Sequence, residues 1–295
     1  MSDSPELAFR LHALVGGTPA YRDMCRGSAP ASVEDLDAWV VGTLLDPASA
    51  MFREGNTLIA EDPDVADAAV YFAVLSAISS GRTRRSEIAG AVGRAEGALA
   101  HPLSVLIRAE LVAPLADAIR QKRTTYHVAE PMLRLHQLVI APNEGRLARR
   151  HGRALWAEVA DTVSARIYGP HFETLARLWC AEYAGQATLG GTASSVGPTV
   201  VACREHASSH ELDVVVSEVR ADRPSRIIAL GEAKWRSRPT GLDELARLEH
   251  LRVVLGAEQA KLLLFARRGF TAELAAMARR PDVELIDLER LYAGS

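Results

Sequence analysis

Two runs of aliphatic and β-branched residues, at 211–216 and 227–234, most constrain how this chain folds. Their sequences are ELDVVV and IIALGEAK, and the segment between them contains Ala-Asp-Arg-Pro-Ser at 221–225. Runs of this composition favour strands, and the intervening sequence is typical of a turn. We therefore predict two antiparallel strands that are neighbours in one sheet.

Charged side chains gather at the end of the second run. Because residues two apart on a strand share a face, Glu232 and Lys234 should point the same way and Ala233 the opposite way. If the strands pair as the turn suggests, Asp213 lies close to that face. Carboxylate oxygens bind Mg²⁺ (or Mn²⁺), and a nearby lysine can orient a water and offset charge on a phosphate. The spacing alone fits a metal site and an exposed salt bridge equally well.

Two details favour the metal site. The chain has only three lysines, Lys122, Lys234 and Lys261, against 31 arginines, so a lysine here is exceptional. Burying an unpaired charge is costly, which makes charges unusual at the end of a strand as apolar as 227–230.

Length and composition indicate about two domains, since domains usually span roughly 100–200 residues. The net charge of −3 over 295 residues gives no overall attraction to nucleic acid, so such binding needs local patches. The cysteines Cys25, Cys180 and Cys203 are isolated, which fits a reducing cytoplasm. No apolar run reaches the ~18 residues of a membrane span. The chain also lacks a G-x-x-x-x-G-K-[ST] motif, so we do not expect it to bind ATP alone.

The first half of the chain is predicted to be mainly helical. Residues 1–62 form helices at 5–14, 33–44 and 48–59, with a break and a new helix at Val-Gly-Gly-Thr-Pro, 15–19. Residues 63–131 have the rhythm of a winged helix: helices at 64–79, 84–92 and 97–109, then strands at 111–115 and 124–128. Residues 132–168 are linking helices.

Basic residues in the predicted winged helix are candidate DNA contacts. They are Arg84 and Arg85 before the second helix, and Arg120, Lys122 and Arg123 at the hairpin tip. The third helix offers few side chains for reading bases, which argues against sequence-specific contact. The alternative is that this module only packs domains together.

Residues 169–295 alternate between helix and strand after a glycine-, serine- and threonine-rich loop at 189–198. We predict helices at 171–184, 242–255 and 271–278, and strands at 199–202, 261–266 and 283–287 around the two strands already described. This order predicts an α/β domain (α+β overall) with a mixed sheet flanked by helices.

The Asp213…Glu232-x-Lys234 pattern resembles that of the PD-(D/E)XK nucleases, which implies a restriction-endonuclease-like fold. In that resemblance Asp213, Glu232 and Lys234 are catalytic, and Asp213 and Glu232 hold the metal. Glu211 or Glu173 assists in holding the metal. Glu173 is a candidate because the first helix of this fold often supplies a carboxylate. Glu173 also fits an exposed glutamate in the first turn of a helix, favoured there by the helix dipole.

The order of all these parts resembles the C-terminal part of archaeal-type, signal-transduction-like P-loop ATPases, in which a lid-like segment and a winged helix precede a nuclease-like domain. The Gly-x-Pro at 17–19 is similar to a motif of that lid. In this resemblance the ATP-binding domain would precede residue 1, so we expect the chain to be either a fragment of such an ATPase or the partner of a separate P-loop ATPase subunit.

Two functions follow from the sequence. The first is a Mg²⁺-dependent, DNA-cleaving domain joined to a DNA-contacting winged helix. The second is a non-catalytic module that binds DNA or protein through a degenerate nuclease fold. We expect a cytoplasmic protein with no membrane segment.

Overall fold

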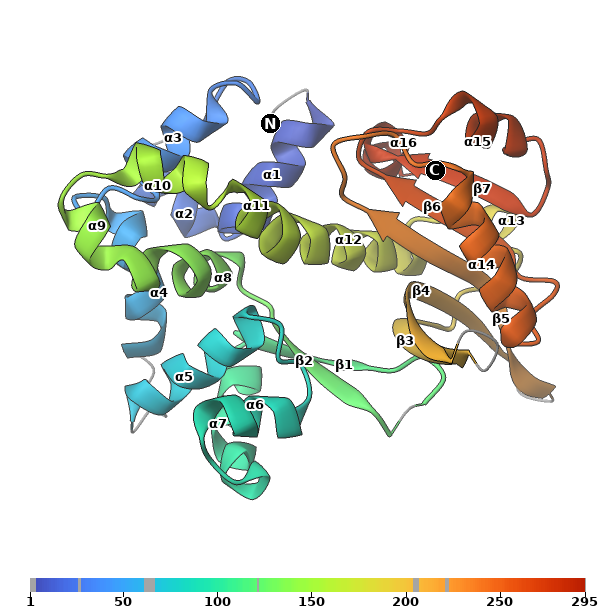
Figure 1. Cartoon of the computed structure of the whole chain (residues 1–295), viewed down its shortest axis with the longest axis horizontal. Helices are drawn as coiled ribbons and strands as arrows, with labels where there is room; N and C mark the ends of the chain where they lie inside the picture. Colours follow the sequence, from blue (N-terminus) through green and yellow to red (C-terminus); the bar gives the residue numbers. More distant parts are fainter. Residues whose placement is uncertain are drawn as a thin grey trace. The chain divides into compact units, whose positions relative to one another are not determined.

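The computed structural model of the chain describes residues 4–25, 28–60, 67–120, 122–203, 207–220 and 223–294 (Figure 1). The chain divides into two compact units. The first contains residues 1–115 and 125–168, and the second contains 116–124 and 169–295. Helices and a mixed sheet together confirm the predicted α/β class.

The first unit begins with four helices: α1 (Pro5–Val15), α2 (Pro19–Met24), α3 (Leu36–Thr43) and α4 (Ala50–Ala60). The predicted break falls at Gly16, whose φ of 69° ends α1 in a conformation that favours glycine. Pro19 then occupies the first turn of α2, where its missing N–H costs no hydrogen bond. The break and the new helix are therefore confirmed.

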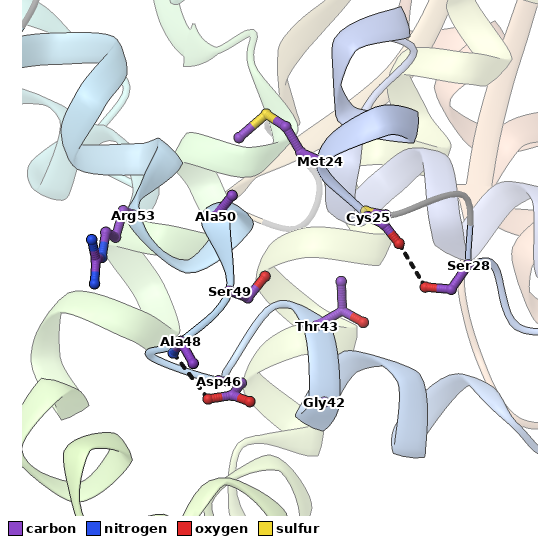
Figure 2. Close-up of a pocket in the computed structure, with 10 residues that line it drawn as sticks. All are labelled: Met24, Cys25, Ser28, Gly42, Thr43, Asp46, Ala48, Ser49, Ala50 and Arg53. Carbon is purple, nitrogen blue, oxygen red and sulfur yellow. Dashed lines mark hydrogen bonds between the residues drawn. The ribbon is translucent and has the colours of Figure 1, made fainter.

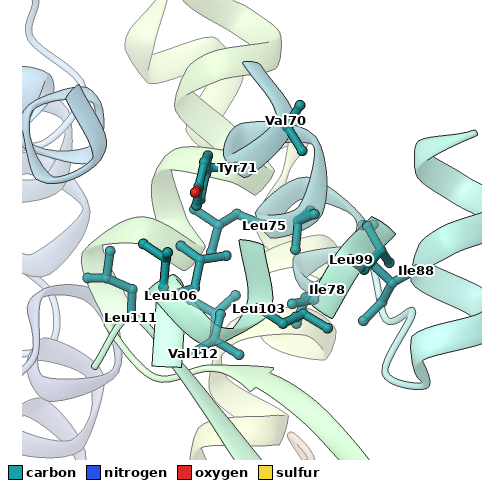
Figure 3. Close-up of a cluster of buried hydrophobic side chains, with 14 of the residues drawn as sticks. Val70, Tyr71, Leu75, Ile78, Ile88, Leu99, Leu103, Leu106, Leu111 and Val112 are labelled. Atoms are coloured by element: carbon teal, nitrogen blue, oxygen red, sulfur yellow. The ribbon is translucent and has the colours of Figure 1, made fainter. Parts of the chain in front are cut away.

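Three helices and a hairpin follow, in the predicted winged-helix order. The elements are α5 (Ala68–Ser79), α6 (Arg85–Val92), α7 (Ala100–Arg108), β1 (Val112–Ala116) and β2 (Thr124–Val128). Leu75, Leu103 and Leu106 are fully buried in the core that the three helices enclose with the base of the hairpin (Figure 3). The third helix is preceded by a 3₁₀ turn, η1 (Glu96–Leu99), instead of running on from residue 97. Its Pro102 lies in the first turn of α7, the part of a helix that tolerates proline.

The rest of the first unit is a nearly continuous run of short helical pieces: α8 (Pro131–Leu135), η2 (His136–Ile140), η3 (Ala141–Asn143), α9 (Glu144–Ala148), α10 (Gly152–Glu158), α11 (Ala160–Val163) and η4 (Ser164–Tyr168). In η2, a π-helical turn, the buried His136 packs against the backbone of Gly55 in α4. A Cβ on Gly55 would lie 2.3 Å from the His136 ring, so only glycine fits there.

A five-stranded sheet forms the centre of the second unit, in the order β3-β4-β5-β6-β7. The strands are β3 (Ser195–Cys203), β4 (Ser208–Arg220), β5 (Arg223–Lys234), β6 (Lys261–Ala266) and β7 (Val283–Asp287). The first three are antiparallel, and β6 and β7 run parallel to β5, so the predicted hairpin and mixed sheet are confirmed. Residues 221 and 222 of the predicted turn lie outside the described residues.

The first strand of this sheet is longer than the sequence predicts. Residues 195–198 belong to β3, although their glycine and proline are typical of a loop. β3 is an edge strand with an irregular register between Gly197 and Thr199. An edge strand tolerates such residues because one of its sides needs no ladder hydrogen bonds.

Helices cover both faces of the sheet. They are α12 (Gly169–Glu182), α13 (Gln186–Leu189), α14 (Leu242–Val254), α15 (Ala272–Met277) and α16 (Leu288–Ala293). Neither α13 nor α16 is predicted from the sequence. On α12, Trp179 packs edge-on against Phe265 with ring centroids 5.7 Å apart. Leu264, the preceding residue of β6, is buried in one cluster with Leu248 of α14. Because successive strand residues face opposite sides, α12 and α14 lie on opposite faces.

The tip of the β1–β2 hairpin belongs to the second unit, whereas the sequence assigned it to the winged helix. The Ala118 N–H donates to the Pro198 carbonyl oxygen at 2.8 Å, and the Thr199 hydroxyl donates to Asp117 Oδ1 at the same distance. The tip thus satisfies polar groups on the open edge of β3. Edge strands attract such partners because half of their backbone groups are otherwise unpaired.

Candidate active site

The predicted residues of the second unit meet where the pairing of β4 with β5 ends. The pairing of β4 with β5 stops at Val214 and Gly231. Beyond Gly231, the backbone groups of β5 that face β4 need another hydrogen-bond partner. Asp213 supplies it, because its Oδ2 accepts a hydrogen bond from the Ala233 N–H at 2.8 Å. The Asp213 carboxyl group is therefore held against β5 beside Glu232, as the sequence predicts.

Glu232 and Lys234 share one face of β5, also as predicted. The Lys234 ammonium contacts Glu232 Oε1 directly. Trp235 lies on the opposite face, where it packs on Phe172 of α12 with ring centroids 5.6 Å apart. Glu232 is only 3% exposed, so the interpretation as a salt bridge on the surface is wrong for this carboxylate.

Two residues of α14, which the sequence analysis missed, complete the surroundings of Glu232. Arg247 Nη1 lies 2.5 Å from Glu232 Oε1, and Arg247 Nη2 donates to the Glu211 carbonyl oxygen at 2.6 Å. Glu244, which is 6% exposed, lies with its Oε2 3.6 Å from Lys234 Nζ. A glutamate and an arginine three residues apart in a helix are common, so their spacing carried little signal. Their position beside Leu245 and Leu248 was the available clue.

A third group comes from α12. Glu173 is half-buried, and its carboxyl group lies within electrostatic range of Glu211, Glu232 and Lys234. Arg177, one helical turn later, donates from Nη1 to the Asp213 carbonyl oxygen at 3.0 Å. Glu173 lies near the start of α12, four residues after Gly169, but its side chain is half-buried. The interpretation as an exposed first-turn glutamate is therefore wrong.

Burial and mutual repulsion perturb these carboxyl groups. Desolvation, followed by repulsion from Glu232 and Glu173, raises the pKa of Asp213 to about 8. Desolvation also raises the pKa of Glu173, against the attraction of Arg177. Burial lowers the pKa of Arg177 for the complementary reason, because a buried cation is poorly solvated. Acids with strongly perturbed pKa values are typical of sites that bind a ligand or carry out chemistry.

One oxygen of this cluster has no hydrogen-bond partner within the described part of the chain. Lys234 and Arg247 both approach Oε1 of Glu232, and its buried Oε2 is left unpaired. Leaving a buried carboxylate oxygen unpaired costs free energy, so such an atom indicates a missing ligand. Among the residues described, no group of three or more His, Cys, Asp or Glu side chains is already arranged to hold a metal ion.

Glu211 is peripheral to the cluster. Its side chain is exposed, and its contribution to the pKa of Glu173 shows that its carboxylate lies within electrostatic range. Its backbone is more firmly involved, through the hydrogen bond from Arg247.

The five candidate DNA contacts are divided between the two units. Arg84 and Arg85 belong to the first unit, whereas Arg120, Lys122 and Arg123 belong to the second. Arg84 is exposed with Nε 3.9 Å from Glu87 Oε1, and Arg85 is half-buried with Nη2 3.5 Å from the Tyr126 hydroxyl. The three tip residues are exposed.

The first unit contains a separate cavity of about 580 Å³ between α2, α3 and α4 (Figure 2). Small side chains line it, together with Met24, Asp46 and Arg53. Asp46 Oδ1 accepts a hydrogen bond from the Ala48 N–H at 3.0 Å, so this carboxylate stabilises the turn before α4. The predicted lid-like segment thus has a cavity, and Asp46 and Arg53 are the charged residues that line it among those that the structure describes.

None of the helices among the described residues is long and apolar enough to cross a membrane.

Comparison with known proteins places the chain in no family. No family profile matches it, and no curated protein matches it. Among solved structures, the crystal structure of protein VC1899 from Vibrio cholerae aligns at 17% sequence identity with a TM-score of 0.29. The alignment covers 82% of this chain and 52% of that chain, so this chain spans about half the length of that protein. A likeness this low supports no inference about function.

Proposed function

We propose that the second unit is a metal-dependent nuclease-type domain, in which Asp213, Glu232 and Lys234 form the active site. The observation that carries this proposal is the buried Oε2 of Glu232, which has no hydrogen-bond partner within the described part of the chain, on a strand whose next N–H donates to the Asp213 carboxyl group. A strand hairpin presents both carboxylates, and a lysine two residues after Glu232 contacts it. The same three residue types, at the same strand positions, carry the resemblance to PD-(D/E)XK nucleases.

The carboxylates of this cluster have the chemistry that a divalent cation requires. Asp213 and Glu232, assisted by Glu173, would hold Mg²⁺ or Mn²⁺, and the more exposed Glu211 would bind through water. A cation would satisfy Glu232 Oε2 and would remove the repulsion that raises the pKa of Asp213. When bound, such an ion supplies a water of lowered pKa and neutralises charge on a phosphate. Lys234 would hold that water or donate to the phosphate.

DNA is the substrate that we propose. Exposed basic residues at the hairpin tip, Arg120, Lys122 and Arg123, belong to the same unit as the site and can contact phosphates. Arg84 and Arg85 of the winged helix are a second candidate contact. We also propose a separate P-loop ATPase subunit as a partner, on the resemblance of the whole order of elements.

A binding module without chemistry is the second candidate function. One observation favours it: Lys234 and Arg247 already neutralise Glu232, and no ready-made metal cluster exists among the described residues. A site that has lost its chemistry can retain exactly such ion pairs for stability.

Replacing Lys234 by methionine separates the two functions. In Mn²⁺ or Mg²⁺, the wild-type protein should cut linear, circular or branched DNA, and Lys234→Met should lower the rate by about 100-fold or more, as expected for a lost electrostatic stabiliser. Lys261→Met is the matched control, because Lys261 also pairs with a glutamate, Glu284, at 3.7 Å, but at the opposite end of the parallel strands.

The control variant should cut DNA at the wild-type rate. A wild-type protein that binds DNA but cuts none of these substrates in either metal would refute the nuclease and favour the binding module. Equal losses in the two lysine variants would show that the effect is on folding.

A further inference from the structure

Two carboxylates and two cations alternate around the buried end of β5. Lys234 Nζ contacts Glu232 Oε1 and lies 3.6 Å from Glu244 Oε2. Arg247 Nη1 lies 2.5 Å from the same Glu232 oxygen and 3.9 Å from the same Glu244 oxygen. Arg236 Nη2 also lies 2.8 Å from Glu244 Oε1, so three cations contact the two carboxylates of this ring before Asp213 or Glu173 is counted.

Arg247 does more within this ring than neutralise charge. Its second nitrogen, Nη2, donates to the Glu211 carbonyl oxygen of β4 at 2.6 Å while Nη1 contacts β5. One planar guanidinium thus links α14 to two strands, and these strands carry the two proposed metal ligands. A guanidinium suits this task because its donors are fixed in one plane.

We infer that Arg247 is a positioning residue for the metal site, which holds Glu232 by Oε1 and so keeps Oε2 available to the metal. This inference rests on the proposed function. Arg247 contacts Oε1 of Glu232, whereas the metal would bind Oε2. Residues that orient metal-binding side chains in this way typically raise metal affinity by about 10–100-fold.

The test is a titration of the full-length chain with Mn²⁺, followed by electron paramagnetic resonance of the free ion. Arg247→Met should weaken Mn²⁺ binding by about 10–100-fold. Arg247→Lys should recover part of the affinity, because a lysine can keep one contact to Glu232 but cannot also reach the Glu211 carbonyl. In a Glu232→Gln background, Arg247→Met should have little further effect, because both changes act on the same carboxylate.

Arg252→Met is the matched control for a general effect on stability. Arg252 lies on the same helix and makes the same combination of contacts, to a carboxylate and to a main-chain carbonyl: Asp282 Oδ2 at 2.7 Å and Ala260 O at 3.2 Å. We expect it to bind Mn²⁺ like the wild-type protein.

Three outcomes would overturn the inference: unchanged Mn²⁺ affinity in Arg247→Met, a gain in affinity, or an equal loss in Arg252→Met. A gain would mean that Arg247 competes with the metal instead of positioning its ligand. A wild-type protein that binds no Mn²⁺ would overturn it as well. If the wild-type protein binds Mn²⁺, Arg247→Met does not, and no DNA is cut, the positioning role stands and the nuclease proposal fails.

Discussion

Replacing Asp213 by asparagine should make the second unit more stable at pH 8 and leave its stability at pH 4 nearly unchanged. The structure holds the Asp213 carboxyl group in a half-buried place beside two other carboxylates, which raises its pKa from 3.8 to about 8. Asparagine has nearly the same shape, cannot become negative, and keeps an oxygen to accept the hydrogen bond from Ala233.

The sign follows from proton binding. In the unfolded chain this carboxyl group loses its proton near its ordinary pKa of 3.8, but in the metal-free folded protein it keeps the proton up to about pH 8. Between these values the folded state binds more protons, so the free energy of unfolding of the wild-type protein falls as pH rises. Its contribution is complete below pH 3.8 and is lost as the pH rises through about 8.

A pKa that rises from 3.8 to about 8 sets an upper limit of roughly 6 kcal/mol on this loss. Water reaches part of the side chain and screens its charge, so we expect Asp213→Asn to gain about 2–3 kcal/mol at pH 8.

Hydrogen exchange measured by mass spectrometry can follow this difference in the second unit alone. Peptides that cover the buried strand β6 report the opening of this unit, after correction for the intrinsic exchange rate at each pH. The expected result is slower exchange in Asp213→Asn than in the wild-type protein at pH 8, and equal exchange at pH 4. Added Mn²⁺ should protect the wild-type protein and not the variant. A variant that is less stable at pH 8, or a difference independent of pH, would refute the reasoning.

Further predictions concern side chains away from this site. Asp282→Asn should show the opposite pH dependence, because hydrogen bonds from Arg280 and then from Arg252 lower the pKa of Asp282. The variant should be less stable than the wild-type protein at neutral pH. Urea denaturation should show that this difference in stability becomes smaller as the pH falls below about 4. Gly55→Ala should destabilise the first unit by about 1–3 kcal/mol, because its methyl group would overlap the buried His136 ring by more than the gain in helix propensity offsets. Gly90→Ala, in open space on α6, should stabilise this unit by about 0.5–1 kcal/mol, and thermal denaturation giving both changes the same sign would contradict the packing argument.

Local patterns in the sequence determined most of the elements that carry the site. β4 and β5 follow from aliphatic runs, and the alternation of side chains on a strand placed Glu232 with Lys234 and away from Ala233. The antiparallel pairing of the same two strands was enough to bring Asp213 to Glu232. The helices of the winged helix follow from apolar periodicity and stop signals, such as Gly93 at the end of α6.

Loop-like composition misled the sequence analysis where the tertiary context decides. Gly197 and Pro198 extend β3 because this strand lies at the edge of the sheet, and the Pro198 carbonyl oxygen meets the N–H of Ala118 some eighty residues earlier in the chain. No sequence pattern within the hairpin tip predicts its contact with Pro198. Strand order decides which backbone groups remain open, and strand order is a property of the whole domain.

Among the buried charged residues, local strand geometry positions some and the packing of a distant helix positions the others. Asp213, Glu232 and Lys234 are found by counting residues along two paired strands, because backbone geometry alone sets their positions. Glu244 and Arg247 join them only because α14 packs across β5. The leucines of α14 are buried there, which brings Arg247 to Glu232 and Glu244 to Lys234. The sequence by itself determined which groups the hairpin brings together. The tertiary structure decided which cations neutralise them and which carboxylate oxygen stays open, because those contacts depend on long-range packing and not on local period.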